Sequence, residues 1–334
     1  MSEVKLHMSV PPVYCFPIYA NLLSIISAHE DYEAWYFSNF IQLNASIEKH
    51  TLSFYDCWSY FHKCPLVINN SINRWIINEK WDGDITSFLV DTLNKNSYIY
   101  FFVDEAKLSN SFFSKEFETF THDIMVYGYN LNTKEFYIAG AFASGKYDMS
   151  ICNFDEMQHA YDNTDLSKDW LHGIQLMRLN KEKRYGLSLH YVKEQISDYL
   201  YSTNSAYKIN DPHYYPQCFG LDVYKVLEDY LSKLLNGTEL ELSIKPFHFL
   251  YEHKKCMDER IAYFEQNDIF TNKPKLEDLK NTFSNIHNKS LKIRNLFLKY
   301  AISGESMYLQ RALVELTEIK LIEKTSIHLL IESI

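Results

Sequence analysis

The spacing of apolar residues changes near residue 180, and this change limits the folds that the chain can adopt. Before it, helical stretches are mixed with strand-like runs over residues 97–104, 122–129, 135–139 and 172–179, and the turn formers of 130–134 predict a hairpin. After it, apolar residues recur every three or four positions over residues 188–201, 221–235, 247–266, 276–302 and 305–333. The sequence therefore predicts an α+β domain over residues 1–180 and a mostly helical domain over residues 181–334.

Two short segments of the first domain carry the residue types of nucleophilic catalysis. In the first, Cys15 precedes Pro17 and an apolar helical stretch, so its thiol should lie at a helix N-terminus, where the helix dipole favours the reactive thiolate. In the second, His122 begins a strand-like run, from which an imidazole can project toward that helix end. The pair predicts a thiolate–imidazolium site with Cys15 as nucleophile and His122 as general base.

Composition and charge limit the partners, the cellular location and the cofactors that we expect for this protein. The formal net charge is −10 and the lysines and arginines are not clustered, which argues against nucleic acid or an anionic membrane as partner. No apolar run approaches the roughly 18 residues of a membrane span, and the start of the chain has no signal-peptide pattern, so we expect a cytoplasmic protein. In that compartment the six scattered cysteines are most simply thiols. Phosphate-binding glycine motifs are absent, so we expect no nucleotide cofactor.

Two groups of metal-ligating residue types fall short of a metal site. The Cys-x4-His-x-Cys spacing that begins at Cys57 matches no common zinc pattern and lacks a fourth ligand. His248, Glu252 and Cys256 share one face of a helix, where a polar seam against a neighbouring helix is the commoner arrangement. We therefore expect no bound metal.

Short segments spread over most of the chain form a further pattern. They are the Cys15-Phe-Pro helix start, the apolar run 98–104, the histidine run 122–129 followed by 136–138, and the segments 218–224 and 251–257 of the second domain. Together they resemble the family of butirosin biosynthesis protein H. The resemblance implies a papain-like fold for the first domain, with an active-site cysteine and histidine at Cys15 and His122.

The family resemblance also implies an activity. Its members suggest an acyltransferase that moves an acyl group from the thioester of an acyl or peptidyl carrier protein, or of pantetheine, to a small amine or hydroxyl in natural-product biosynthesis. Carrier proteins are usually acidic, as this chain is, so docking would need a local basic patch. The compact candidates are Lys181 to Arg184 and the pair Lys254 and Lys255. An aromatic-rich surface is also compatible with a homodimer.

The chain departs from the papain-like pattern beside the histidine. The strand after the histidine strand usually carries an Asp or Asn that orients the imidazole, but this chain has Ala139 and Gly140 there. The nearest polar candidates for this role are Asn130, Asn132 and Asp148, and the more distant Asp104 could also approach. In the second domain, Tyr214 and Tyr215 lie in a proline-bounded aromatic loop and are the candidates for lining the pocket.

Each functional interpretation has a structural alternative. A lone cysteine usually packs as a small apolar side chain, and a lone histidine at a strand end usually bonds to backbone. Three classes of function therefore stay open: an acyltransferase, a papain-like amidase or peptidase that uses the same two residues, and a non-catalytic scaffold whose site has decayed.

Overall fold

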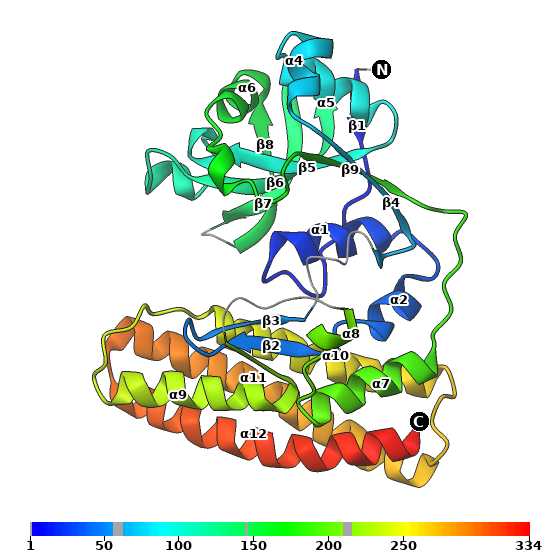
Figure 1. Ribbon diagram of the computed structural model, residues 1–334, viewed down its shortest axis with the longest axis vertical. Coiled ribbons are helices and arrows are strands. Elements are labelled where there is room, and N and C mark those ends of the chain that lie inside the picture. Colours follow the sequence, from blue (N-terminus) through cyan, green and yellow to red (C-terminus); the bar gives the residue numbers. More distant parts are fainter. Residues whose placement is uncertain (1, 56–62, 144–145, 210–215) are drawn as a thin grey trace. The chain divides into compact units, whose positions relative to one another are not determined.

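The chain forms two compact units (Figure 1). The computed structural model describes residues 2–55, 63–143, 146–209 and 216–334. The first unit consists of Met1–Tyr32 and Trp58–Tyr185, and the second of Glu33–Cys57 and Gly186–Ile334. The expected boundary at residue 180 lies close to Tyr185, whereas the sequence did not predict that residues 33–57 would cluster with the helical part.

The first unit is built on an antiparallel sheet. Its strands are β1 (Glu3–Lys5), β4 (Val67–Ile72), β5 (Tyr98–Asp104), β6 (Thr121–Asn130), β7 (Glu135–Ala143), β8 (Lys146–Asn153) and β9 (Ile174–Leu179). Their order is β4-β9-β5-β6-β7-β8, and β1 also pairs with β6. All seven residues of β5 are buried, which fits its almost uniformly apolar sequence and its central place in the sheet. The expected hairpin at residues 130–134 joins β6 to β7, with Asn130 opposite Glu135.

Helices and short turns complete the first unit. They are α1 (Pro17–Ile26), α4 (Trp75–Trp81), α5 (Ile85–Leu93) and α6 (Phe154–Asp162), with the 3₁₀ turns η2 (Glu105–Lys107), η3 (Phe113–Lys115) and η4 (Leu166–Lys168). The Asp84 side chain caps α5 by accepting from Ser87 N, and Asn153 and Glu156 form a capping box at the start of α6. Local sequence therefore fixes where these two helices begin.

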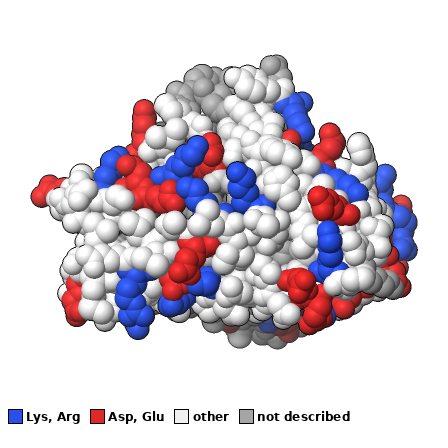
Figure 2. All heavy atoms as spheres, turned by 90° about the horizontal axis from the view of Figure 1, so that it is seen from below, with Lys and Arg blue, Asp and Glu red and all other residues white. Residues whose placement is uncertain are grey.

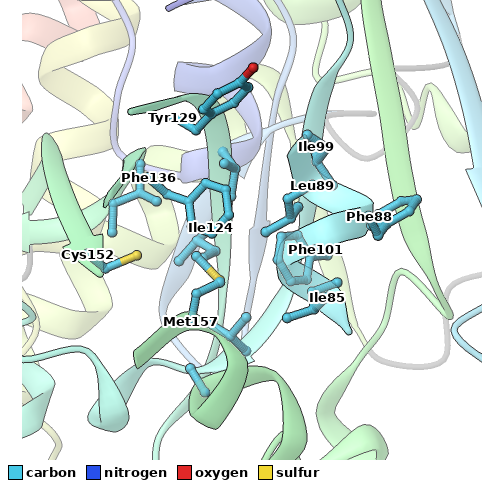
Figure 3. Packing of buried hydrophobic residues seen from close by; sticks show 14 of the residues in the cluster. Ile85, Phe88, Leu89, Ile99, Phe101, Ile124, Tyr129, Phe136, Cys152 and Met157 are labelled. Carbon is cyan, nitrogen blue, oxygen red and sulfur yellow. The ribbon is translucent and has the colours of Figure 1, made fainter. Parts of the chain in front are cut away.

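One face of the sheet carries a cluster of buried apolar side chains (Figure 3). Phe101 of β5, Ile124 of β6 and Phe136 of β7 contribute from the sheet, and Phe88 of α5 and Met157 of α6 pack with them. Alternate residues of each strand face this cluster because successive side chains of a strand point to opposite faces. The intervening residues belong to the other face, which is important for the placement of the candidate site.

The second unit is mostly helical, with one small sheet. Its helices are α2 (Tyr32–Ser38), which begins in the first unit, α7 (Leu189–Leu200), α8 (Ala206–Ile209), α9 (Val223–Leu235), α10 (Lys245–Gln266), α11 (Leu276–Ser303) and α12 (Ser306–Ser333), with the 3₁₀ turns η5 (Gly220–Asp222) and η6 (Lys273–Lys275). The strands are β2 (Leu43–Ser46), β3 (Thr51–Phe54) and β10 (Gln217–Phe219), in the antiparallel order β10-β2-β3. This pairing joins residues 33–57 to the second unit.

The five helices expected after residue 185 are confirmed, and the fold is α+β with a helical C-terminal half. The break between α11 and α12 falls at Gly304, whose φ of 73° is the left-handed conformation that glycine adopts most readily. In η5, a Cβ added to Gly220 would lie 2.1 Å from the Tyr199 carbonyl oxygen, so only glycine fits this close approach. Within the described ranges, no helix is both long and apolar enough to cross a membrane.

Candidate functional site

Cys15 lies immediately before α1, as its sequence context predicts. Pro17 is the first residue of the helix, Phe16 is the N-cap in an extended conformation, and Cys15 precedes that cap as a partly exposed thiol. The backbone N–H groups of Tyr19 and Ala20 both donate to the Phe16 carbonyl at 3.1 Å, so the first helical turn is well formed beside the thiol. The N-terminal end of a helix favours negative charge, including that of a thiolate.

His122 is the second residue of β6, and its ring contacts a buried carboxylate. Nδ1 lies 3.0 Å from Glu105 Oε2, in the residue that directly follows β5. The Glu105 side chain is fully buried, and its other oxygen accepts a hydrogen bond from Ser111 Oγ at 2.8 Å. About a quarter of the His122 side chain remains exposed. Glu105 therefore stands where an acid that orients an imidazole would stand.

The sequence did not identify Glu105, because the papain-like pattern places the orienting acid on the strand after the histidine. In the structure the acid instead directly follows the preceding strand, β5. β5 and β6 are antiparallel neighbours, with Asp104 opposite Thr121, so the end of β5 adjoins the start of β6. An acidic doublet at residues 104 and 105, directly after a long apolar run, was the available signal.

Two of the polar candidates from the sequence, Asp104 and Asn130, have other partners. Asp104 Oδ1 accepts from Phe120 N at 2.7 Å and from Ala106 N at 3.2 Å, so this side chain caps η2 and holds the loop. Asn130 lies at the opposite end of β6 from His122, where its side chain accepts from Asn132 N at 2.9 Å in the hairpin turn. Tyr214 and Tyr215 lie outside the described residues.

The two faces of the sheet separate His122 from its neighbour Asp123. Val103, opposite His122, and Ile124 of β6 both face the apolar cluster, so strand alternation directs His122 to that face and Asp123 to the other. Asp123 is buried and accepts a short hydrogen bond from the Tyr100 hydroxyl. His122 Nε2 nevertheless lies 3.6 Å from Asp123 Oδ1, so the second ring nitrogen reaches the carboxylate of the opposite face.

Helix α1 lies on the face to which Asp123 points. The Tyr147 hydroxyl of β8 donates to Asn21 Oδ1 of α1 at 2.8 Å. Cys152 of the same strand belongs to the apolar cluster and is an odd number of residues away, so Tyr147 points away from that cluster. Burial raises the pKa of Tyr147, and the nearby Asp123 charge raises it further. Asp123, Tyr147 and Asn21 thus form a buried polar layer beneath α1.

The second unit contains a different buried charge cluster, in which an ammonium group pairs with a carboxylate. Lys254 Nζ of α10 donates to Glu323 Oε1 of α12 at 2.7 Å, and both side chains are fully buried. Glu323 Oε2 accepts from the hydroxyls of Tyr199 at 3.2 Å and Tyr224 at 2.6 Å. Burial lowers the pKa of Lys254 and raises the pKa values of both tyrosines.

His253 completes this cluster in a defined tautomer. Its Nε2 lies 2.8 Å from the Ile41 carbonyl oxygen, and its Nδ1 lies 3.1 Å from Lys254 Nζ. Because the carbonyl can only accept and the ammonium can only donate, we assign the proton to Nε2 and a lone pair to Nδ1. Burial, reinforced by the Lys254 charge, lowers the pKa of His253 well below its ordinary value. The described polar atoms of this cluster all have partners, so the cluster is suited to joining helices.

The basic residues proposed for carrier docking differ in how exposed they are and in how they are paired. Lys254 is fully buried in the cluster above, so the expectation that it forms part of a docking patch is wrong. Arg184 is exposed, but its Nε lies 2.9 Å from Asp31 Oδ2, and its Nη1 also pairs with Glu30. On the face that Figure 2 shows, basic and acidic side chains are interspersed. In the helices of the second unit, Lys289 pairs with Glu315 and Lys320 with Glu228.

The residues weighed as metal ligands on α10 also have protein partners. His248 Nε2 lies 3.3 Å from Glu252 Oε1. Cys256 Sγ lies 3.4 Å from Arg260 Nη2, whose guanidinium also donates to the carbonyl oxygens of Phe37 and Asn39. These contacts of His248, Glu252 and Cys256 lie within α10 itself, and Arg260 makes the contact with the end of α2. Cys57 and His62 of the other group lie outside the described residues.

No protein-family model matches the chain, and no curated protein matches it either.

Proposed function

We propose that the protein is a cysteine-dependent acyltransferase with a papain-like first unit, in which Cys15 carries the acyl group and His122 transfers protons. The observation that carries this proposal is the 3.0 Å approach of His122 Nδ1 to the buried Glu105 carboxylate. An acid beside Nδ1 leaves Nε2 for proton transfer, and the contact in the structure is an ion-pair approach rather than an aligned hydrogen bond. Together with a thiol at a helix start, these residues have the composition of a nucleophile, a base and an orienting acid.

The proposed reaction has two balanced steps. The Cys15 thiolate attacks the carbonyl carbon of a thioester, a new C–S bond forms, and the leaving thiol takes a proton from His122. His122 then removes a proton from an amine or hydroxyl acceptor, which attacks the acyl-cysteine and releases Cys15 as a thiolate. The donor would be the thioester of a carrier protein or of pantetheine, as the resemblance to the butirosin biosynthesis protein H family suggests. An amidase would use the same residues with water as acceptor.

One observation favours the non-catalytic alternative. Strand alternation directs His122 to the face opposite α1, so its ring must reach round the end of β6 to meet a thiol that precedes α1. The 3.6 Å approach of Nε2 to Asp123 supports such a reach. A protein that binds a ligand without chemistry requires no contact between Cys15 and His122.

Proximity of the two residues is the first test. In the variant His122→Cys, a short thiol crosslinker such as dibromobimane should join residue 122 to Cys15, as identified by peptide mass mapping. The matched control is His159→Cys, which places a thiol at an exposed position of α6 in the same unit. A crosslink yield at residue 122 no higher than at residue 159 would exclude the pair.

Chemistry is the second test. The protein is incubated with an acyl thioester of N-acetylcysteamine, and intact mass is followed with and without an amine acceptor. An acyl adduct on Cys15 that the acceptor removes supports transfer, whereas rapid release of free acid supports hydrolysis. Cys15→Ala should form no adduct, and His122→Ala should slow turnover about 10²- to 10⁴-fold, as expected for loss of a general base. Absence of an adduct on wild-type Cys15 would support the scaffold.

A further inference from the structure

Aromatic rings gather around His122. Phe113 and Phe120 are stacked with centroids 3.9 Å apart, Phe117 lies 5.3 Å from Phe120, and Phe120 lies 5.5 Å from His122. The planes of these three pairs, each of which includes Phe120, differ by 18°, 27° and 26°, whereas the planes of Phe113 and Phe117 differ by 42°. We call Phe113, Phe117 and Phe120 the aromatic shelf. Phe113 and Phe120 both lie within 6 Å of the imidazole, with centroids 5.8 and 5.5 Å from it.

The acidic doublet that follows β5 ties the shelf to the histidine. Asp104 Oδ1 accepts from Phe120 N at 2.7 Å, which fixes one end of the loop. Glu105 accepts from Ser111 Oγ, and the same oxygen of Ser111 accepts from Phe113 N at 3.1 Å, which fixes the other end. Because Glu105 also contacts His122, the carboxylate that holds the imidazole indirectly positions the shelf.

The shelf is open to solvent at one end. The side chain of Phe117 is 51% exposed, and Phe113 and Phe120 are half-buried. The exposed part of the Phe117 ring adjoins the two half-buried rings, so an apolar group that contacts it would also lie close to Phe120. The open ring offers its face to another flat group, because aromatic rings prefer offset-stacked or edge-to-face contact.

We infer that the aromatic shelf binds the acyl group of the substrate and that this group is aromatic. The inference rests on the proposed function, since the shelf adjoins the proposed base. The open face of Phe117 favours a planar ligand over a puckered one of equal size, because a planar ring contacts that face over its whole area. The shelf therefore selects the acyl group, while Cys15 and His122 perform the transfer.

Two thioesters that differ only in planarity test the inference. Phenylacetyl and cyclohexylacetyl N-acetylcysteamine have the same carbon skeleton and the same CH₂ group beside the carbonyl, so their intrinsic reactivities are close. At subsaturating concentration, Cys15 should be acylated roughly threefold to tenfold faster by the phenylacetyl thioester. Phe117→Leu should bring this ratio to about one with little effect on the cyclohexylacetyl rate.

The matched control is Phe112→Leu, a change of the same residue type in the same loop. Phe112 is 38% exposed and contacts Phe113 edge-on, outside the near-parallel stack, so its replacement should leave the preference intact. A phenylacetyl to cyclohexylacetyl rate ratio of about one in the wild type, or an unchanged ratio in Phe117→Leu, would overturn the inference. Acylation of Cys15 in the same experiment would still support the proposed function.

Binding of non-reactive ligands separates the inference from the chemistry. If neither thioester acylates Cys15, the proposed function fails, and the dissociation constants of phenylacetamide and cyclohexylacetamide then test the shelf alone. Tighter binding of phenylacetamide that Phe117→Leu removes would retain the shelf as a site for aromatic groups. Equal binding of the two amides would overturn it.

Discussion

Glu105 in the first unit and Glu323 in the second are both fully buried carboxylates, yet their surroundings differ. Glu323 has an equally buried partner in Lys254 and two tyrosine hydroxyls that donate to its second oxygen. Glu105 pairs with a partly exposed histidine that lies beside an open aromatic shelf. The Glu323 cluster is sealed from solvent, whereas solvent reaches the histidine that pairs with Glu105.

The difference separates a structural role from a chemical one. A sealed, fully partnered charge contributes to one specific packing of helices, but no substrate can reach it. A charge that holds a partly exposed imidazole can control proton transfer at the surface of the protein. We therefore expect mutation of the Lys254–Glu323 pair to lower stability and mutation of Glu105 to slow turnover.

The largest effect is expected from breaking the sealed pair. Lys254→Met leaves Glu323 buried without its counter-charge, which should lower the free energy of unfolding by about 3–5 kcal/mol. Urea unfolding followed by circular dichroism of the helices measures this change. Lys255→Met is the matched control. This adjacent lysine is partly exposed, and its ion pair with the partly exposed Glu259 is long, at 3.7 Å. Equal losses in the two variants would contradict a structural role for the sealed pair.

The open carboxylate should affect turnover more than stability. Glu105→Gln retains the shape of the side chain but removes the charge that stabilises an imidazolium, so acyl transfer should slow by up to about 10²-fold, less than on loss of the whole base. The pH dependence of the rate should also shift, which a purely structural residue would not cause. Glu116→Gln, an exposed change in the same loop, serves as control. A large loss of stability with an unchanged pH profile would place Glu105 with Glu323 as a structural residue.

The sequence predicted the elements well where local pattern determines them. The helices after residue 185 and the strands β5, β6, β7 and β9 follow from apolar spacing, and the start of α1 follows from Pro17. The sequence did not predict the placement of β2, because its partner β10 lies more than 170 positions along the chain. Such long-range pairing depends on tertiary structure rather than on local propensity.

The candidate site was predicted only in part, for the same reason. Cys15 and His122 were identified from their local context, but their partners depend on sheet register and faces. Glu105 reaches His122 because β5 and β6 are antiparallel, and Asp123 faces α1 because side chains alternate along β6. Neither relation can be read from spacing alone without the strand order.

A smaller effect is expected from acidification of the sealed cluster. His253 is neutral in the folded state, and its pKa lies well below the ordinary value of 6.5 because of burial and the neighbouring Lys254 charge. As the pH falls below 6.5, the unfolded chain binds a proton that the folded chain does not, so stability is complete above 6.5 and decreases below it. Between pH 6.5 and 5.5 this amounts to about 1 kcal/mol.

Replacement of this histidine isolates its contribution from other titrating groups. His253→Gln keeps a donor for the Ile41 carbonyl and an acceptor for Lys254 but does not titrate. Unfolding midpoints of wild type and variant, measured between pH 7.5 and 5.5, should converge as the pH falls. Parallel pH profiles would show that His253 takes up a proton without leaving the folded state, and that the cluster is less sealed than its contacts indicate.

The smallest effect on stability is expected where charges meet at the surface. Arg184 pairs with Asp31 and Glu30, and the Tyr185 backbone and Arg184 lower the pKa of Asp31, but these groups are solvated and screened by salt. Arg184→Ala should leave the unfolding midpoint unchanged within error. If an acidic carrier protein docks at residues 181–184, the same variant should still slow transfer from the carrier while transfer from a pantetheine thioester stays constant. Equal effects on both donors would exclude docking at this patch, and a marked loss of stability would show that exposure alone does not distinguish structural charges from functional ones in this protein.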